Sequence, residues 1–191
     1  MDRLVSSFIL GYHGCDKSVA DRLVKGTESF KPSNNDYDWL GSGIYFWEAN
    51  PRRGLDFARE LESRREGNIK TPAVVGAVIE LGLCLDLTSN AGIEHFVDAY
   101  KQIEAISKKA EMPRNSQDLL QRKLDCAVIK KVHEMREEDG KPPINTVRGV
   151  FIEGKPVFCG SGVYEKTHIQ IAVRDLDCIK GVFQVPPRFL T

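Results

Sequence analysis

The sequence predicts an α+β protein, with strands near both ends of the chain and helices in the middle. Three observations favour this class. Apolar, β-branched and aromatic runs occur before residue 82 and after residue 146, as expected of buried strands. Between them, apolar residues recur at helical spacing. The 191-residue chain is 41% hydrophobic and 28% charged, so we expect one globular domain over 1–191 with a helical insertion at about 89–138.

The N-terminal part of the chain predicts a strand, a helix and a long loop. Residues 7–12 (SFILGY) form an apolar and aromatic run, which predicts a buried strand that ends at Gly14 and carries His13 at its end. A helix over 16–25 should follow. Residues 27–43 are dense in Ser, Asn, Asp, Pro and Gly, a composition typical of a surface loop.

After this loop, the sequence pattern alternates between strands and helices. Residues 43–47 (GIYFW) and 71–82 predict strands, the second of them central in its sheet, and a helix should begin at Pro51. Two amphipathic helices would follow. Their expected inner faces are Ile93, Phe96, Val97, Tyr100 and Ile103 in the first, and Leu120, Leu124, Ala127, Val128 and Met135 in the second.

The last quarter of the chain returns to strands. Residues 146–154 and 155–162 predict a hairpin, with its turn at Glu153, Gly154 and Lys155. Two further strands are expected over 168–175 and 179–185.

Charge and cysteine content exclude several classes of protein. The chain has 27 Lys and Arg against 27 Asp and Glu, so no overall field attracts nucleic acid or an anionic membrane. No apolar stretch approaches the roughly 18 residues of a membrane-spanning helix, and the N-terminal apolar run is short for a signal peptide. Five cysteines lie singly, with no CxxC pair. These features predict a cytoplasmic protein with reduced thiols, no metal and no membrane association.

Two glycine motifs carry the strongest functional signal: GYHG at 11–14 and GSGIYF at 41–46. Together with THIQIAVRD at 167–175, they resemble the His-Tyr branch of the ADP-ribosyltransferase superfamily, which includes poly- and mono-ADP-ribosyl polymerases and many bacterial toxins. The similar stretches are 12–14, 38–58 and 167–183, whereas 89–138 matches no known part of the family. The resemblance implies two packed, mainly antiparallel sheets around an NAD cleft.

The resemblance also implies a site that splits the bond between nicotinamide and ribose in NAD. The backbone of Gly14 would hydrogen-bond the nicotinamide carboxamide, His13 would donate to the adenosine-side ribose, and Tyr45 would stack on the nicotinamide ring. Breaking this bond creates an oxocarbenium-like cation, so such a site must hold the leaving group and exclude water. Other implied NAD contacts are Tyr12, Gly43, Arg53 and His168.

Gln170 departs from the family pattern, because many members carry a Glu at this position. A carboxylate there accepts a hydrogen bond from the ribose and stabilises positive charge, whereas an amide keeps only the hydrogen bond. The difference amounts to roughly 2–4 kcal/mol of transition-state stabilisation. We therefore expect Gln170 to act beside His13 and Tyr45 in a single ADP-ribose transfer, or another carboxylate to substitute: Glu165, Asp36 or Asp38.

The acceptor and the biological setting stay open. The window Lys101–Lys131 holds eight Lys or Arg and four Asp or Glu, which suits an RNA or DNA footprint or merely two solvated helices. A protein acceptor is equally open. By analogy with the family, the chain would be a bacterial toxin, restrained by an antitoxin or used against phage. Two rival functions are an inactive module that binds NAD or ADP-ribose, and an NAD glycohydrolase.

Each candidate residue also has a purely structural explanation. His13 and Tyr45 could belong to the core. His168 and Gln170, two residues apart on a predicted strand, share a face and could be the polar outer side of a sheet. Trp39 could stack on adenine or on a target base, or could simply pack.

Overall fold

The computed structural model describes residues 8–64, 69–107 and 112–190. It confirms a mixed α and β protein and divides the chain into two compact units. The first unit consists of Met1–Lys31, Tyr45–Leu81 and Leu176–Thr191, and the second of Pro32–Ile44 and Gly82–Asp175. Because the segments of the two units alternate along the sequence, neither unit is one continuous stretch of chain.

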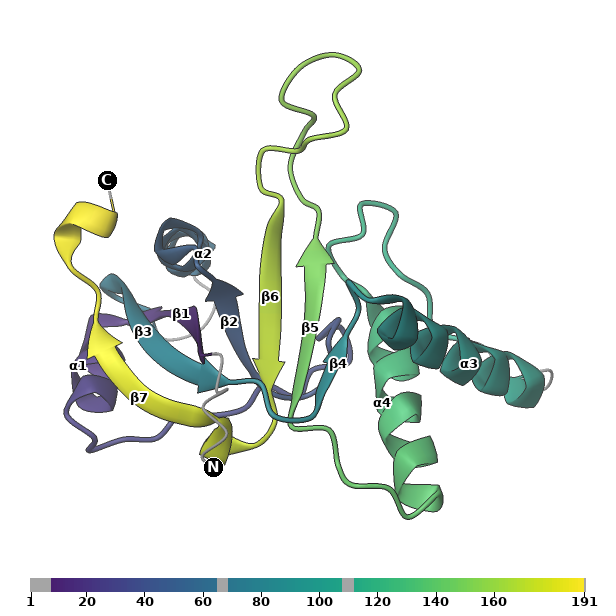
Figure 1. The fold of residues 1–191 in the computed structure, drawn as a ribbon. Helices are drawn as coiled ribbons and strands as arrows, with labels where there is room; N and C mark the ends of the chain where they lie inside the picture. Colours follow the sequence, from purple (N-terminus) through teal and green to yellow (C-terminus); the bar gives the residue numbers. More distant parts are fainter. Residues whose placement is uncertain (1–7, 65–68, 108–111, 191) are drawn as a thin grey trace, which may run out of the picture. The chain divides into compact units, whose positions relative to one another are not determined.

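Four antiparallel strands form the sheet of the first unit (Figure 1). They are β1 (Phe8–Asp16), β2 (Ile44–Glu48), β3 (Pro72–Glu80) and β7 (Ile179–Gln184), in the spatial order β2-β1-β3-β7. The predicted strand over 71–82 is therefore confirmed as a central strand. The antiparallel pairing agrees with the expectation, while the predicted packing of two sheets around a cleft stays a prediction.

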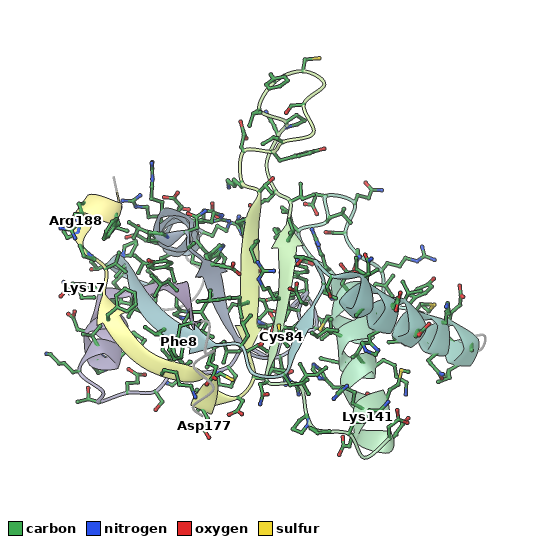
Figure 2. The ribbon with its side chains drawn as sticks, in the orientation of Figure 1. Phe8, Lys17, Cys84, Lys141, Asp177 and Arg188 are labelled. Carbon is green, nitrogen blue, oxygen red and sulfur yellow. The ribbon has the colours of Figure 1, made fainter. Side chains whose placement is uncertain are left out.

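β1 is longer than the sequence pattern indicated. It begins at Phe8, which is labelled in Figure 2, and pairs with β3 from Phe8↔Glu80 to Asp16↔Pro72. The prediction that the strand ends at Gly14 is therefore wrong, and His13 lies inside the strand. The reason is the ladder itself, because β3 continues alongside this end of β1, with Ala73 opposite Cys15 and Pro72 opposite Asp16.

Side-chain caps begin both helices of the first unit at the expected places. α1 (Lys17–Val24) begins after Asp16, whose carboxylate accepts from the backbone N–H of Ser18 at 2.9 Å. Asp16 also accepts from Lys70 and Thr71. These hydrogen bonds, above all that from the Ser18 hydroxyl, hold the pKa of Asp16 well below its usual range. α2 (Pro51–Ser63) is capped in the same way by Asn50.

α2 packs on β1 through two glycines. A Cβ on Gly14 would lie 2.1 Å from the carbonyl oxygen of Gly54, which no real structure tolerates. A Cβ on Gly54 would in turn meet Val74 at 3.1 Å. The helix backbone therefore rests directly on the strand backbone, and a side chain on Gly14 would displace it.

The second unit contains three of the strands and two long helices. β5 (Thr146–Phe151) pairs in parallel with β4 (Cys84–Asp86) and antiparallel with β6 (His168–Val173). β4 was not predicted, since three residues are too few for a recognisable pattern; its first residue, Cys84, is labelled in Figure 2.

The predicted hairpin over 146–162 is wrong. β5 pairs with β6, and residues 152–167 form an irregular loop that extends from the ends of both strands (Figure 1). Within this loop, Pro156 and Tyr164 form an isolated bridge, and Gly160 adopts a φ of +82°. Pro and Gly at these positions prevent a regular ladder, although the aliphatic residues beside them suggested a strand.

The helical middle is confirmed as α3 (Asn90–Ile106) and α4 (Lys123–Glu138). Part of the expected packing is wrong, because Ile93 and Val97 are 47% and 41% exposed. Leu120 is also exposed and precedes α4. The N-cap residue of α4 is Arg122, which makes no side-chain cap hydrogen bond. The side-chain oxygen of Asn115, eight residues before the helix begins, instead accepts from the backbone N–H of Leu124 at 2.9 Å.

The described residues contain no membrane-spanning helix, no metal-binding group and no disulfide. None of the helices there is long and apolar enough to cross a membrane. No group of three or more His, Cys, Asp or Glu side chains in these ranges could hold a metal ion. All five cysteines fall within the described ranges, and all are free thiols.

We predict that Gly14→Ala lowers the free energy of unfolding by about 1–3 kcal/mol or more, because the added methyl group collides with the Gly54 carbonyl. Urea denaturation of both proteins measures this difference. Gly181→Ala is the matched control, since a Cβ on Gly181 of β7 meets open space. Equal stabilities of the natural chain and Gly14→Ala would contradict the direct backbone contact.

Candidate functional site

His13 connects the two glycine motifs within the first unit. Its Nδ1 lies 2.9 Å from the carbonyl oxygen of Tyr45, 32 residues away in the sequence. A carbonyl oxygen only accepts hydrogen bonds, so Nδ1 carries the proton. In the neutral ring Nε2 is then an acceptor.

The surroundings of His13 favour this neutral form. Its ring packs edge-on against Phe30 at 5.3 Å between centroids and lies 5.7 Å from Phe46. Burial lowers the pKa of His13, and the hydrogen bond to Tyr45 opposes that shift without cancelling it. At neutral pH the imidazole is therefore uncharged.

The side chains of His13 and Tyr45 leave the sheet on opposite faces. Tyr12 pairs with Trp47, so these two residues share a face, and alternation along β2 places the Tyr45 side chain on the same side. His13 and Phe46 occupy the other face, as their ring contact shows. The structure thus brings the imidazole to the backbone of Tyr45 and not to its phenol.

Two other predicted NAD contacts of this unit are largely used in packing. Tyr12 is buried and meets Phe183 edge-on at 6.2 Å. Arg53 is only 8% exposed, with its guanidinium 3.4 Å from Glu60 and over the ring of Trp47. A contact between Arg53 and the pyrophosphate stays a prediction, and it would compete with these neighbours.

The predicted residues of the second unit form a separate hydrogen-bonded group around Gln170. The indole Nε1 of Trp39 donates to Oε1 of Gln170 at 2.7 Å. Gln170 Nε2 lies 3.1 Å from Nε2 of His168, whose Nδ1 is 2.6 Å from the carbonyl oxygen of Lys166. Because the indole can only donate and the carbonyl can only accept, every donor in this chain of bonds is assigned. Gln170 donates to a neutral His168.

This group explains why an amide suits position 170. A Glu would keep the oxygen that accepts from Trp39, but it would turn its second oxygen toward the lone pair of His168 Nε2. That arrangement is repulsive unless His168 gains a proton. Gln170 and neutral His168 therefore match each other.

Arg122 completes the group and was not among the predicted residues. Its guanidinium carbon lies 4.9 Å from the ring centroid of Trp39 and 4.2 Å from that of Phe151. The ring of His168 stacks on Phe151 at 5.5 Å. Burial lowers the pKa of Arg122, and the charge of Asp125 opposes that shift. No sequence motif marks Arg122, which lies in the predicted insertion at about 89–138.

Gly43 has a packing role that accounts for its identity. Its backbone N–H and carbonyl both bond to Ser33, at 3.0 and 2.8 Å. A Cβ on Gly43 would lie 2.9 Å from the carbonyl oxygen of Val173 in β6. The predicted NAD contact of Gly43 remains compatible with this close approach and untested by it.

The alternative carboxylates all have local partners. Asp36 lies 2.8 Å from Nζ of Lys123. Asp38 accepts from the Ser33 hydroxyl at 2.8 Å and from a backbone N–H. Glu165 accepts from the backbone of Lys155 at 3.2 Å. These bonds give each carboxylate a structural role, and none of them stands out as a substitute for the missing Glu.

The basic window is partly neutralised by nearby acids. Lys101 lies 3.0 Å from Asp98, and Lys131 lies 3.4 Å from Glu134. Residues 108–111, which include two of its lysines, fall outside the described ranges. The described ion pairs weaken the electrostatic argument for a nucleic-acid footprint, which stays a prediction.

Comparison with known proteins adds one partial likeness. An uncharacterized protein of Methanocaldococcus jannaschii is 34% identical to this chain over 86 residues. The match covers 44% of this chain and 38% of that protein. No family model and no solved structure matches the chain. Function is therefore argued from the residues described above.

We predict that the imidazole of His13 titrates below pH 6.5, its ordinary midpoint. Proton NMR across pH 4–8 follows the ring resonances, and His13→Asn assigns them. Since the folded-state pKa lies below the unfolded one, the contribution of His13 to stability is present above pH 6.5 and is lost as the pH falls toward the folded pKa. A midpoint above 6.5 would contradict the neutral ring.

Proposed function

We propose that this chain is a NAD-dependent mono-ADP-ribosyltransferase. The hydrogen bond between His13 and the Tyr45 carbonyl supports the proposal most directly. It joins the imidazole of GYHG to the backbone of GSGIYF on neighbouring antiparallel strands, while the Tyr45 ring lies on the opposite face of the sheet. A chance occurrence of both motifs would not require them to meet.

The proposed reaction transfers ADP-ribose from NAD to a macromolecular acceptor. The bond between ribose C1′ and the pyridinium nitrogen breaks, and nicotinamide leaves with the electron pair. The acceptor nucleophile bonds to C1′ and releases its proton to solvent. The barrier falls where the site holds nicotinamide and ribose in place and excludes competing water.

The protonation of His13 refines its proposed role. A neutral ring with its proton on Nδ1 offers Nε2 as an acceptor. We therefore expect the adenosine-side ribose to donate a hydroxyl proton to His13, rather than to accept one. Gly14 and Tyr45 are proposed to hold the nicotinamide, through its carboxamide and its ring respectively.

Gln170 limits the chemistry in this proposal to a single transfer. An amide cannot stabilise the cationic transition state as a carboxylate does, so elongation of an ADP-ribose chain is not expected. The bonds that Gln170 makes to Trp39 and His168 also favour a second candidate function. In that case the chain binds NAD or ADP-ribose without cleaving it.

The proposed setting is a bacterial toxin or an anti-phage effector, held in check by an antitoxin. RNA, DNA and protein are all proposed acceptors. For RNA or DNA, the exposed cations of Lys101–Lys131 would supply the phosphate contacts, and binding would weaken steeply with salt.

Incubation of the purified chain with NAD labelled in the adenylate part tests the proposal. A cell extract supplies acceptors, and the products are separated by electrophoresis and thin-layer chromatography. Label on a macromolecule supports transfer, and digestion with nucleases or proteases identifies the acceptor. Free ADP-ribose indicates a glycohydrolase. Unchanged NAD with measurable binding indicates the binding module.

We predict that Tyr45→Ala lowers kcat/KM for NAD by about tenfold or more, because the nicotinamide loses an aromatic partner. Tyr45→Phe keeps the ring and should retain most of the activity. Tyr100→Ala, on α3, is the control for loss of a tyrosine elsewhere. Full activity of Tyr45→Ala, with cooperative unfolding, removes Tyr45 from the site.

We predict that Gln170→Glu preserves or raises the rate of NAD cleavage, since it restores a carboxylate at the position that the family uses. If the rate is only preserved, the affinity for NAD should still change, because a charged group then faces the ribose. A rate and an NAD affinity that are both unchanged would show that Gln170 does not face the ribose.

A further inference from the structure

The side chains around Gln170 form a closed group in which Arg122 has a central place. Trp39 and Phe151 lie 5.3 Å apart between ring centroids, and the guanidinium of Arg122 covers both rings. Trp39 then bonds to Gln170, and Phe151 stacks on His168. The side chain of Arg122 is 12% exposed, so it belongs to the interior of this group.

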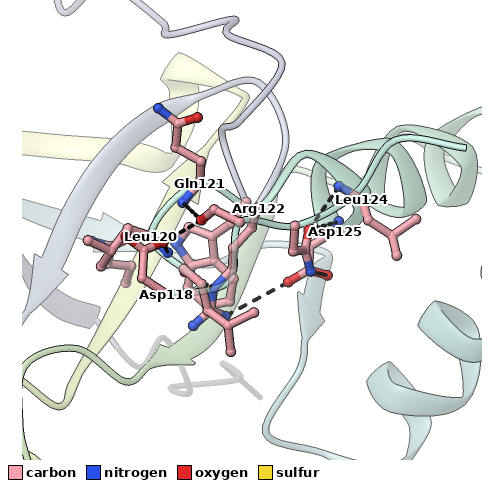
Figure 3. A network of polar contacts seen from close by, with 11 residues as sticks. Asp118, Leu120, Gln121, Arg122, Leu124 and Asp125 are labelled. Carbon is pink, nitrogen blue, oxygen red and sulfur yellow. Dashed lines mark hydrogen bonds and ion pairs between the residues drawn. The ribbon is translucent and has the colours of Figure 1, made fainter.

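Arg122 lies at the end of a tightly hydrogen-bonded turn (Figure 3). Nε of Arg122 donates to the carbonyl oxygen of Leu119 at 2.9 Å. Leu119 has a φ of 56°, a left-handed conformation that costs free energy for a residue with a side chain. Ser116 holds this conformation through three bonds, two to Gln121 and one to the N–H of Leu119.

We propose that Arg122 is a positioning residue for Gln170, acting through the indole of Trp39. A planar cation over two rings fixes the plane and rotation of the indole, and so the direction in which its N–H points. That N–H decides which end of the Gln170 amide is the oxygen and which is the nitrogen. The role of Gln170 in this inference rests on the proposed function; the positioning by Arg122 does not.

The identity of the side chain matters because lysine can replace it only in part. A guanidinium stacks on both aromatic faces at once, whereas a lysine ammonium is a strongly hydrated point charge. The group is also sealed from solvent on several sides, since Trp39 is 8% exposed, Phe151 7% and His168 6%. Cation–π contacts are stronger when they are desolvated, so the loss of Arg122 should directly change the orientation of the Trp39 indole.

The insertion would thereby have a role in the site. The turn over residues 115–122 lies between α3 and α4, in the predicted insertion. Through Arg122 it would orient a residue of β6. The insertion would thus help to shape the site rather than only cover the sheet.

NMR of the indole N–H groups tests the proposal without reference to NAD. The chain has two tryptophans, and Trp39→Phe identifies the Trp39 resonance. We expect Arg122→Met to shift this resonance upfield and to speed its hydrogen exchange by about tenfold, as the bond to Gln170 weakens. Arg122→Lys should show a smaller change in the same direction. If Arg122→Met fails to unfold cooperatively, Arg122→Lys carries the test.

Arg114→Met is the matched control, because Arg114 is an exposed arginine of the same insertion. It should leave the Trp39 resonance and its exchange rate unchanged. Unchanged spectra in both Arg122 variants would overturn the positioning role. Where the natural chain turns over NAD, Arg122→Met should lower kcat more than it alters KM. If the natural chain neither binds nor cleaves NAD, the proposed function is overturned instead. The NMR test of the positioning role of Arg122 is unaffected by that outcome.

Discussion

β1 hydrogen-bonds to β3 over its whole length, and the position of every candidate residue of the first unit depends on that ladder. It fixes which side chains of β1 alternate to each face, and it places Gly14 where the backbone of α2 passes. β1 also pairs with β2 along its other edge, and this pairing places the His13 ring within hydrogen-bond distance of the Tyr45 carbonyl oxygen. The part of the proposed site that lies in the first unit is therefore a consequence of strand pairing.

Much of the secondary structure could be predicted because local signals were strong. Asp16 and Asn50 cap helices, and Gly26 takes the left-handed conformation that ends α1. The errors arose where local patterns were ambiguous. Residues 155–162 look like a strand by composition, but a strand needs a partner, and β6 already occupies the edge of β5.

The candidate site could be predicted only in part. His13 and Tyr45 were found through motifs, but the face on which each side chain lies depends on pairing register, which a motif does not contain. Arg122 could not be found at all. Its importance comes from contacts with Trp39 and Phe151, which lie far from it in the sequence. The assignment of His13 as an acceptor likewise required the geometry of its bond to Tyr45.

The loop between β5 and β6 has an implication for how this protein can diverge. Phe151 and His168 are paired neighbours at the base of the loop, so the sheet closes before the loop begins. The entropic cost of closing a loop grows only slowly with its length. Its sequence, including the 68% exposed Phe158, can therefore be exchanged, lengthened or trimmed between Glu153 and Lys166 while the strands keep their register. Homologues should differ most there, and a fused reporter should be tolerated there best.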